Sequence, residues 1–406
     1  MNCGLLGQRL AHSYSPFIHN RLGDYSYSLF EKQPEELADF LLSKDFSGLN
    51  VTMPYKKSVI PYCHELTACA TKLGAVNAIV RQNDGRLVGH NTDYFGFQSM
   101  IRHTGQSFNG RKVLVLGSGG ASATAVAVLK DQGAEVVVIS RTSEENYCNL
   151  HRHRDADVIV NATPVGMYPD CGISPIDLDD FPALSCAIDV VYNPARTQFL
   201  LEAEKRGIVT ENGLWMLVAQ AKESAEWFTG KKIDDDVIGD IHAALVRQAE
   251  NIVLIGMPGC GKTTIGALLA QKLGKHFVDI DAEIEQRTQL SVPEILGKYG
   301  EDRFREMETE VLAAFGKESG LVIATGGGCV TRKENYPLLH QNGRICWIKR
   351  DIFLLPTAGR PLSSEMDIAA MYTLREPVYN SYADISVYNN DTIEDAIDQI
   401  TKGLYG

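Results

Sequence analysis

The sequence predicts an α/β protein of three consecutive domains, and three observations support this prediction. The chain has 406 residues, more than one hydrophobic core usually organises. Short apolar runs alternate with helical patterns along most of it, as in sheets covered by helices. Two apolar runs end in glycine-rich turns that open a helix, at Gly117 and at Gly256. We expect domains at 1–101 (with a returning helix at about 235–249), at 102–234 and at 250–406.

Composition narrows the classes of protein that the chain can belong to. Hydrophobic residues make up 44% and charged residues 22%, as in soluble globular proteins. The net charge of −12 disfavours a general binder of nucleic acid or anionic membranes. No apolar run has membrane-spanning length, the first residues do not resemble a signal peptide, and nine scattered cysteines lack a C-x-x-C pair. We therefore expect a cytoplasmic protein with free thiols and small-molecule substrates; nothing indicates its oligomeric state.

The stretch Asn251–Thr264, NIVLIGMPGCGKTT, predicts a nucleotide site. Ile252–Ile255 is typical of a buried strand, and a helical pattern follows the G-x-x-x-x-G-K-T sequence. In this arrangement Lys262 bridges the outer phosphates and the Thr263 hydroxyl is placed to ligate Mg²⁺. The backbone N–H groups that would surround the phosphates belong to Gly259, Cys260, Gly261 and Thr264.

Residues 1–100 contain four polar turns that follow or precede apolar stretches. Their sequences are His12-Ser13-Tyr14-Ser15-Pro16, Asn50-Val51-Thr52-Met53-Pro54-Tyr55-Lys56, Gly74-Ala75-Val76-Asn77 and Gly89-His90-Asn91-Thr92-Asp93. Each turn alone is explained by ordinary backbone preferences, because Ser, Asn, Asp, Gly and Pro dominate loops. A lysine and an aspartate that converge with several hydroxyl and amide groups would suit a polyhydroxylated substrate.

Residues 101–249 predict a dinucleotide-binding unit. A strand at Lys112–Leu116 leads into Gly117–Ala121 and a small-residue helix at Ser122–Leu129, and a second strand spans Glu135–Ile139. The second strand ends at Ser140-Arg141-Thr142, where an arginine accommodates the 2′-phosphate of NADP. Glu144 and Glu145 follow closely and oppose that preference.

Two later strands and one polar segment complete this region. The strands are expected at Asp157–Val160, ahead of a turn with Thr163, and at Ala187–Val191, ahead of Tyr192. The cluster of Cys148, His151 and His153 faintly resembles metal ligands. Interleaved arginines favour an exposed polar segment instead.

Together these turns resemble the shikimate dehydrogenase family over about residues 3–245. The family's motifs S-x-S-P, N-V-T-x-P-x-K, G-A-V-N and N-T-D stand at Ser13–Pro16, Asn50–Lys56, Gly74–Asn77 and Asn91–Asp93. Its coenzyme loop G-x-G-G-A and following R-T stand at Gly117–Ala121 and Arg141-Thr142. The resemblance implies an α/β substrate domain followed by a Rossmann-type NADP domain, and NADPH-dependent reduction of 3-dehydroshikimate to shikimate.

The same resemblance assigns roles to individual residues. It implies that Lys56 transfers the proton at the carbonyl oxygen and that Asp93 holds substrate hydroxyls and orients Lys56. Substrate would be bound by Ser13, Ser15, Asn50, Thr52, Asn77, Tyr192 and Gln220. The coenzyme would be bound by Gly117, Gly119, Gly120, Ala121, Ser140, Arg141, Thr142, Thr163, Val190 and Gly213. The chain departs from the family at Ser140, where Asn is frequent, and at Glu145, near which a second basic residue is usual.

The join to the last domain is short. Asp235–Ala249 predicts one amphipathic helix, and the next strand begins almost at once, without a Gly/Ser- or Pro-rich spacer. We expect a nearly rigid fusion.

Several features after the phosphate loop suit phosphoryl transfer. Phe277–Asp281 predicts a strand with Asp279 and Asp281 on one side of its end, where paired acids suit a Mg²⁺-bound water and a hydroxyl nucleophile. Glu301–Phe315 predicts a helix on which Arg305 and Glu308 form an ordinary surface ion pair. A strand at Leu321–Ala324 precedes Gly326-Gly327-Gly328, and Gly359-Arg360-Pro361-Leu362 predicts a cationic lid.

Residues 251–406 resemble the shikimate kinase family. The family's D-x-D, F-R-x-x-E, G-G-G, R-P-L and R-x-P-x-Y elements stand at Asp279–Asp281, Phe304–Glu308, Gly326–Gly328, Arg360–Leu362 and Arg375–Tyr379. The resemblance implies a three-layer α/β/α P-loop domain like that of nucleoside monophosphate kinases. Shikimate would be held by Asp281, Arg305, Gly327 and Arg375, with Asp281 as base for its 3-hydroxyl. Arg360 would be the lid arginine near the phosphates, and Asp279 would act through Mg²⁺-bound water. The stretch between Trp347 and Arg360 is short for the family and lacks its usual basic residue.

The two halves support each other, because the first would make what the second consumes. We expect a bifunctional enzyme that uses NADPH, ATP and Mg²⁺ to convert 3-dehydroshikimate through shikimate to 3-phosphoshikimate. Three alternatives stay open: a quinate or NAD-linked dehydrogenase, another small-molecule P-loop kinase, and one half acting as a regulatory module without catalysis. Arg141 and the Ser13–Pro16 turn disfavour the first alternative. The Arg305 and Arg375 pair, suited to a carboxylate, disfavours the second, and the intact Lys56, Asp93, Lys262 and Asp281 disfavour the third.

Overall fold

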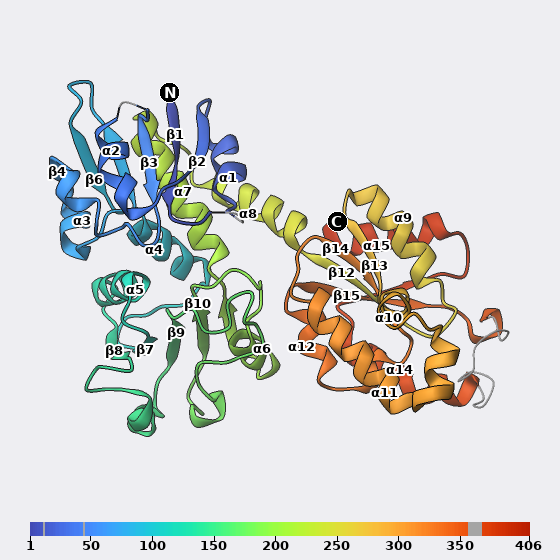
Figure 1. Cartoon of the computed structure of the whole chain (residues 1–406). Coiled ribbons are helices and arrows are strands. Elements are labelled where there is room, and N and C mark those ends of the chain that lie inside the picture. The colour runs from blue at the N-terminus through green and yellow to red at the C-terminus, as the bar shows by residue number, and fades with distance from the viewer. Residues whose placement is uncertain (11–12, 44, 356–367) are drawn as a thin grey trace. The chain divides into compact units, whose positions relative to one another are not determined.

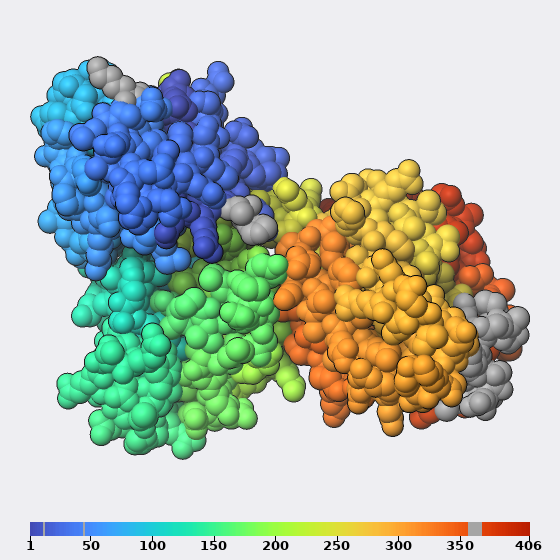
Figure 2. Space-filling view, viewed as in Figure 1, coloured from blue at the N-terminus to red at the C-terminus, as the bar shows by residue number. Residues whose placement is uncertain are grey.

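The computed structural model describes residues 1–10, 13–43, 45–355 and 368–406 and divides into two compact units (Figure 1). Unit 1 comprises Met1–Gly166, Ile173–Tyr192 and Phe199–Leu245. Unit 2 comprises Met167–Gly172, Asn193–Gln198 and Val246–Gly406. Unit 1 contains two sheets and unit 2 contains one. The blue residues of the first sheet and the green residues of the second form two adjoining lobes of unit 1 (Figure 2).

The first sheet of unit 1 is mixed and has the strand order β2-β1-β3-β5-β6-β4. Its strands are β1 (Asn2–Gly7), β2 (Ser26–Glu31), β3 (Gly48–Val51), β4 (Glu65–Leu66), β5 (Ala78–Arg81) and β6 (Leu87–His90). β1 pairs in parallel with β2 and β3, whereas β5 runs antiparallel to both β3 and β6. β3 is buried along its whole length, and the turn that follows its C-terminal end reaches the surface, where Met53 is exposed.

Helices close this sheet and connect it to the second one. They are α1 (Ser15–Leu22), α2 (Leu37–Leu42), α3 (Ala68–Leu73), α4 (Asp93–His103) and α7 (Leu214–Thr229). α4 and α7 approach closely at Gly96, where a Cβ atom would lie 2.8 Å from the Met216 carbonyl oxygen. This contact is what brings the polar side chains of α7 beside the start of α4.

The second sheet of unit 1 is entirely parallel, in the order β11-β10-β9-β7-β8. Its strands are β7 (Lys112–Leu116), β8 (Glu135–Ile139), β9 (Val158–Asn161), β10 (Cys186–Asp189) and β11 (Val209–Glu211). The helices α5 (Gly120–Asp131) and α6 (Gln198–Lys205) lie between these strands in the sequence, and α8 (Asp236–Ala249) follows α7. The strand order reverses between β7 and β9, and ligands of doubly wound sheets bind at such a point. The sheet thus has the architecture expected for a Rossmann-type domain.

Unit 2 holds a parallel sheet in the order β13-β14-β12-β15-β16. The strands are β12 (Asn251–Ile255), β13 (His276–Asp279), β14 (Leu321–Ala324), β15 (Gly343–Lys349) and β16 (Ile385–Tyr388). α9 (Lys262–Leu273) and α15 (Ile393–Tyr405) cover one face, and α11 (Val292–Phe315), α12 (Asn335–His340) and α14 (Ile368–Tyr382) the other (Figure 1). α10 (Ile280–Thr288) follows β13 directly. Unit 2 has the three α/β/α layers expected of a P-loop kinase.

Sequence patterns located most elements of the sheets but misplaced the end of one strand. The strands predicted at Lys112–Leu116, Glu135–Ile139 and Leu321–Ala324 have those bounds in the structure. The strand predicted at Phe277–Asp281 ends at Asp279, so Asp279 and Asp281 do not share one side of a strand. The cause is local, because the Asp279 carboxylate accepts the backbone N–H groups of Asp281 and Ala282 and so begins a helix. The helix predicted at Glu301–Phe315 is the second part of α11, which is kinked at the non-helical Gly300 (φ 79°).

All nine cysteines lie in the described residues, and none forms a disulfide. Eight of them are buried or half-buried, and Cys148 is the exposed one. Burial raises the pKa of several, for example to about 11 for Cys3, Cys63 and Cys186. Within the described residues no helix is both long and apolar enough to cross a membrane.

Candidate active sites

Lys56 and Asp93 meet beyond the C-terminal ends of β3 and β6 in the first sheet. Lys56 lies in the turn after β3, and Asp93 is the first residue of α4. The Lys56 ammonium donates to Asp93 Oδ2 at 2.6 Å, and Asn77 Nδ2 donates to Asp93 Oδ1 at 2.9 Å. The lysine side chain is 30% exposed and the aspartate side chain 14% exposed. The structure therefore brings a proton donor, a carboxylate and an amide together at a position that solvent and a ligand can reach.

A buried network of polar side chains supports Lys56, Asp93 and Asn77. Thr92 donates its backbone N–H to Asn77 Oδ1 at 2.7 Å, and its hydroxyl lies 3.0 Å from the Ser224 hydroxyl and 3.3 Å from Gln220 Oε1. Asn50 Nδ2 donates to the same Ser224 hydroxyl at 2.7 Å. The predicted site residues Asn50, Asn77 and Gln220 are therefore linked through two side chains, Thr92 and Ser224, that had no assigned role. Ser224 follows Gln220 by one helical turn on α7, a spacing that could have identified it.

Tyr14, between the two serines of the first turn, lies beside Tyr192. Ser13 Oγ accepts the backbone N–H of Ser15 at 3.2 Å, and Ser15 is buried at the start of α1. The rings of Tyr14 and Tyr192 are 5.9 Å apart. Thr52 closes the turn that carries Lys56, because its carbonyl accepts the N–H of Tyr55 at 2.9 Å. Residues 11–12, which adjoin Ser13, lie outside the described part of the chain.

The glycine loop after β7 has the geometry of a pyrophosphate site. Gly117 has φ +107°, and a Cβ atom there would lie 3.0 Å from both the Ala162 carbonyl and Thr163 Cγ2. Around Gly119 and Gly120 a Cβ atom would meet nothing within 4 Å, so open space lies beside the N-terminus of α5. Helix N-termini with free N–H groups attract phosphate. Gly213 has no room for a side chain because a Cβ atom would overlap the Val190 carbonyl, which packs these two predicted residues together.

The end of β8 presents Arg141 to solvent. Ser140 is buried, and its backbone N–H donates to the Ser143 hydroxyl at 3.0 Å, which closes the turn that also holds Thr142. The Glu145 carboxylate is occupied by His153 Nε2 at 3.0 Å and lies 3.9 Å from Arg152. Among the described residues no ion pair involves Arg141, so its charge is available for a 2′-phosphate.

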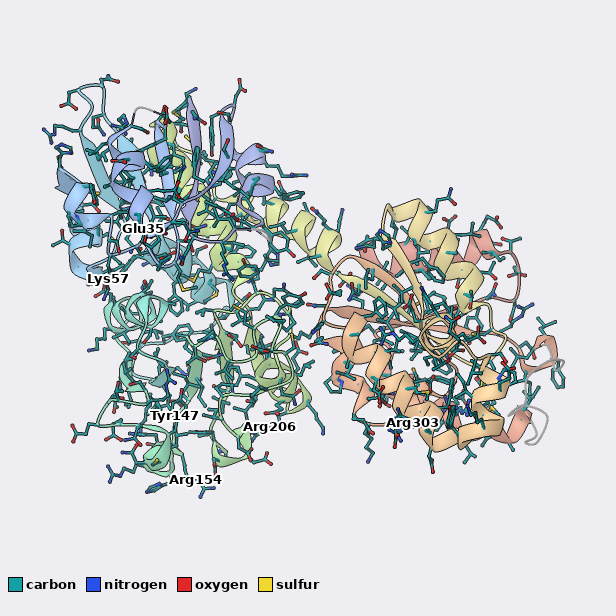
Figure 3. The ribbon with its side chains drawn as sticks, viewed as in Figure 1. Glu35, Lys57, Tyr147, Arg154, Arg206 and Arg303 are labelled. Atoms are coloured by element: carbon teal, nitrogen blue, oxygen red, sulfur yellow. The ribbon has the colours of Figure 1, made fainter. Side chains whose placement is uncertain are left out.

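The suspected metal cluster does not form. His153 is buried against Glu145, whereas Cys148 and His151 are exposed. No group of three or more metal-ligating side chains occurs among the described residues. The segment, which begins at Tyr147 (Figure 3), is thus partly buried rather than wholly exposed.

The third site is a cavity of about 510 Å³ in unit 2, at the C-terminal edge of the sheet. Its wall includes the phosphate-loop residues Gly259, Gly261, Lys262, Thr263 and Thr264. Gly259 and Gly261 have φ +87° and +102°, a conformation that turns the loop's N–H groups inward. The Lys262 ammonium folds back onto the carbonyls of Gly256 at 2.9 Å and Met257 at 3.1 Å. Cys260 is buried, and its carbonyl accepts Asn389 Nδ2 at 2.8 Å.

Two oxygen-bearing side chains suit a magnesium ion. The Thr263 hydroxyl donates to Asp279 Oδ2 at 2.7 Å, and both residues line the cavity. Hydroxyl, carboxylate and water oxygens are the ligands that Mg²⁺ takes in kinases. The residues predicted to hold the ion are therefore adjacent and of the right chemistry.

Arg305 and Glu308 form a buried ion pair rather than the predicted surface pair. Arg305 is 7% exposed and Glu308 is fully buried, and the guanidinium also contacts Glu301 at 2.9 Å. Burial raises the pKa of the Glu308 carboxyl to about 7, despite the opposing charge of Arg305. Burial also raises the pKa of Asp281, and the neighbouring Asp279 adds to this effect. The i,i+3 pattern could not distinguish a surface pair from this one, because what buries it is the distant glycine segment.

The glycines after β14 are required by close packing. A Cβ atom on Gly326 would overlap Glu308 Oε1, and one on Gly328 would overlap the Arg305 guanidinium. The Gly327 carbonyl accepts Arg375 Nη1 at 3.2 Å and the Tyr379 hydroxyl, so the group that it can offer a ligand is its N–H. Asp281, Arg305, Gly327 and Arg375 all line the cavity, as the resemblance implied. Arg360, with Pro361 and Leu362, lies outside the described residues.

One charged residue of the cavity was missed. Arg350 follows β15 and lines the cavity. The signal that could have revealed Arg350 was its place immediately after a buried strand of a parallel sheet, where ligands bind.

Comparison with known proteins identifies one family in the first part of the chain and another in the last part. The model of the shikimate dehydrogenase substrate binding domain matches residues 5–79, and that of shikimate kinase matches residues 258–405. A shikimate dehydrogenase (NADP(+)) of Caldanaerobacter subterraneus subsp. tengcongensis is 35% identical over 263 residues, which cover 58% of this chain and 94% of the relative.

Solved structures agree with this assignment. A shikimate dehydrogenase from Peptoclostridium difficile is 36% identical, with a TM-score of 0.56, over 60% of this chain and 97% of that one. A Thermus thermophilus shikimate 5-dehydrogenase in complex with NADP(H) and shikimate is 32% identical, with a TM-score of 0.56, over 60% and 99%. A quinate dehydrogenase from Corynebacterium glutamicum in complex with NAD is less similar, at 27% identity and a TM-score of 0.56, over 61% and 98%. The chain therefore belongs to the shikimate dehydrogenase family over its first three-fifths and continues as a shikimate kinase domain.

Proposed function

We propose that this chain reduces 3-dehydroshikimate to shikimate with NADPH and then phosphorylates shikimate with ATP and Mg²⁺. The observation that carries the proposal is the presence, on one chain, of two family matches whose reactions share an intermediate. The contacts support it, because Lys56 already meets Asp93 and Thr263 already meets Asp279.

In the reductase site, Lys56 is the proton donor at the substrate carbonyl oxygen. Bound NADPH supplies the hydride. Asp93 keeps the ammonium in place through its Oδ2 and is itself held by Asn77 through Oδ1. A fixed donor lowers the barrier because the proton is positioned before the reaction begins. The hydroxyls of Ser13, Ser15 and Thr52 and the amides of Asn50, Asn77 and Gln220 would bind the substrate's polar groups, together with Tyr192.

In the kinase site, Asp281 is the base that accepts the proton of the shikimate 3-hydroxyl. ATP supplies the phosphoryl group. Arg305, Arg375 and the Gly327 N–H would hold the shikimate carboxylate and hydroxyls, with Arg305 fixed by its two glutamates. Lys262 would leave the carbonyls of Gly256 and Met257 for the phosphate oxygens, and Arg360 would neutralise charge on the transferring group. Thr263 and Asp279 would hold Mg²⁺ and its waters.

The coenzyme choice follows from charge at the end of β8. Arg141 is exposed, whereas the carboxylate of Glu145 is engaged by His153 and does not oppose it. The relatives named for NADP support the same preference.

One experiment tests the whole proposal. The purified chain is mixed with 3-dehydroshikimate, NADPH, ATP and Mg²⁺, and NADPH loss and product mass are followed together. We expect 3-phosphoshikimate to accumulate. Accumulation of unphosphorylated shikimate would contradict the kinase assignment, and intact NADPH alongside phosphorylation of added shikimate would contradict the reductase assignment.

A further inference from the structure

Arg350 is held rigidly beside the phosphate loop. β15 lies next to β12 in the sheet, with Trp347 opposite Ile255, the last residue before the loop. The Lys349 carbonyl accepts the Asn389 N–H at 2.8 Å, and Asn389 Nδ2 donates to the Cys260 carbonyl at 2.8 Å. These two bonds tie the end of β15 to the loop. Arg350 therefore begins from a fixed strand end and not from the lid.

The guanidinium of Arg350 lacks a counter-charge in the described part of the chain. The side chain is half-buried and lines the cavity, and its Nε is buried without a hydrogen-bond partner there. No ion pair between Arg350 and a described carboxylate is formed. The adjacent Asp351 carboxylate is engaged elsewhere, as the cap that accepts the Phe353 N–H at 3.1 Å. A buried guanidinium N–H without an acceptor is unfavourable, and a carboxylate or phosphate that offers two oxygens satisfies the guanidinium well.

The strand order indicates which anion the Arg350 guanidinium would bind. Asp281 and Gly327 follow β13 and β14, on one side of the central strand β12, whereas Arg350 follows β15 on the other side. The phosphate loop follows β12 and so lies between them. Arg350 is thus placed toward the nucleotide and away from Asp281, the proposed base for the shikimate hydroxyl.

We propose that Arg350 binds the phosphate chain of the nucleotide. This inference rests on the proposed kinase function and adds a nucleotide-binding residue to it. The fork of the guanidinium would donate hydrogen bonds to two phosphate oxygens, and its fixed backbone would keep it in place.

The test compares Arg350→Ala, Arg350→Lys and the uncharged but polar Arg350→Gln in the full chain. Arg303→Ala is the matched control, because Arg303 lies on α11 outside the cavity and pairs with Glu306 and Glu310 (Figure 3). Kinase kcat, the KM values for ATP and for shikimate, ADP affinity by calorimetry, and reductase activity are measured on each protein. The reductase reports whether the rest of the chain is intact.

We expect Arg350→Ala and Arg350→Gln to lower kcat/KM for ATP and ADP affinity about 10- to 100-fold. Arg350→Lys should recover part of the loss, and KM for shikimate should stay within about twofold. Unchanged nucleotide affinity in Arg350→Gln, or a loss confined to shikimate, would overturn the inference. If the unmodified chain binds ADP but does not phosphorylate shikimate, the proposed function fails, while the ADP affinities still decide the role of Arg350.

Discussion

The reductase site and the kinase site satisfy their carboxylates in opposite ways. Both oxygens of Asp93 accept hydrogen bonds from protein side chains, Lys56 and Asn77. In the kinase site, Asp281 Oδ1 and Glu308 Oε1 are buried and have no hydrogen-bond partner within the described residues. The first site is assembled before its substrate arrives, whereas the second requires ligands to complete its charges. A fixed proton donor suits hydride transfer, and a site completed by charge suits phosphoryl transfer.

The largest effect should come from the removal of the Lys56 side chain from the reductase site. Lys56→Ala removes the proton donor and leaves Asp93 with one partner, so we expect reductase kcat to fall about 10²- to 10⁴-fold. Kinase activity measured on the same protein should be unchanged. Lys57→Ala is the control, because Lys57 is the exposed neighbour in the same turn (Figure 3). Full reductase activity in Lys56→Ala would refute the catalytic role of Lys56.

The second prediction concerns the Mg²⁺ ion that we propose binds in the kinase site. Asp279→Asn keeps the size of the side chain but removes the charge that faces Thr263, so the Mg²⁺ concentration for half-maximal kinase activity should rise about 10- to 100-fold. Asp302→Asn, on the exposed surface of α11, serves as control. An unchanged magnesium titration in Asp279→Asn would place the ion elsewhere.

The third prediction uses pH to sharpen the contrast. Burial raises the pKa of Asp281, and the base must be ionised to accept a proton, so acid should inactivate the kinase at a higher pH than an ordinary aspartate would allow. Protonation of Glu308, whose pKa is raised to about 7, would remove the charge that holds Arg305. Kinase kcat/KM for shikimate should therefore decline from pH 8 toward pH 6, by up to about tenfold per unit. A flat profile over this range would show that neither carboxyl limits the reaction.

The smallest effect is expected at the coenzyme. Arg141→Ala removes one exposed contact to a 2′-phosphate, so KM for NADPH should rise about tenfold while KM for NADH changes little. The ratio of the two KM values measures this directly. The neighbouring Arg152→Ala should shift it less, because Arg152 lies near Glu145. Equal changes for both coenzymes would mean that Arg141 acts on the turn and not on the phosphate.

The sequence predicted the sheets and most of the site because their signals are local. Apolar runs such as Lys112–Leu116 coincide with strands, and the glycine loops need their residues for backbone reasons. The errors arose where a distant or competing contact decides the outcome. Asp279 ended its strand by capping α10, and the burial of Arg305 and Glu308 depends on Gly326–Gly328, which lie in another strand connection. Ser224 and Arg350 were missed because their partners are far away in the chain.

Because most of the cysteines are buried, a thiol-reactive reagent should label the chain selectively. A thiol reacts as its thiolate, so the buried side chains whose pKa is raised should react slowly with alkylating reagents. Cys148 is exposed and lies in the short 3₁₀ helix Tyr147–His153, which follows Arg141 and Glu145. A dye attached there would label the coenzyme domain at one position without removal of the other eight thiols. The unmodified protein is thus ready for spectroscopic titration with either coenzyme.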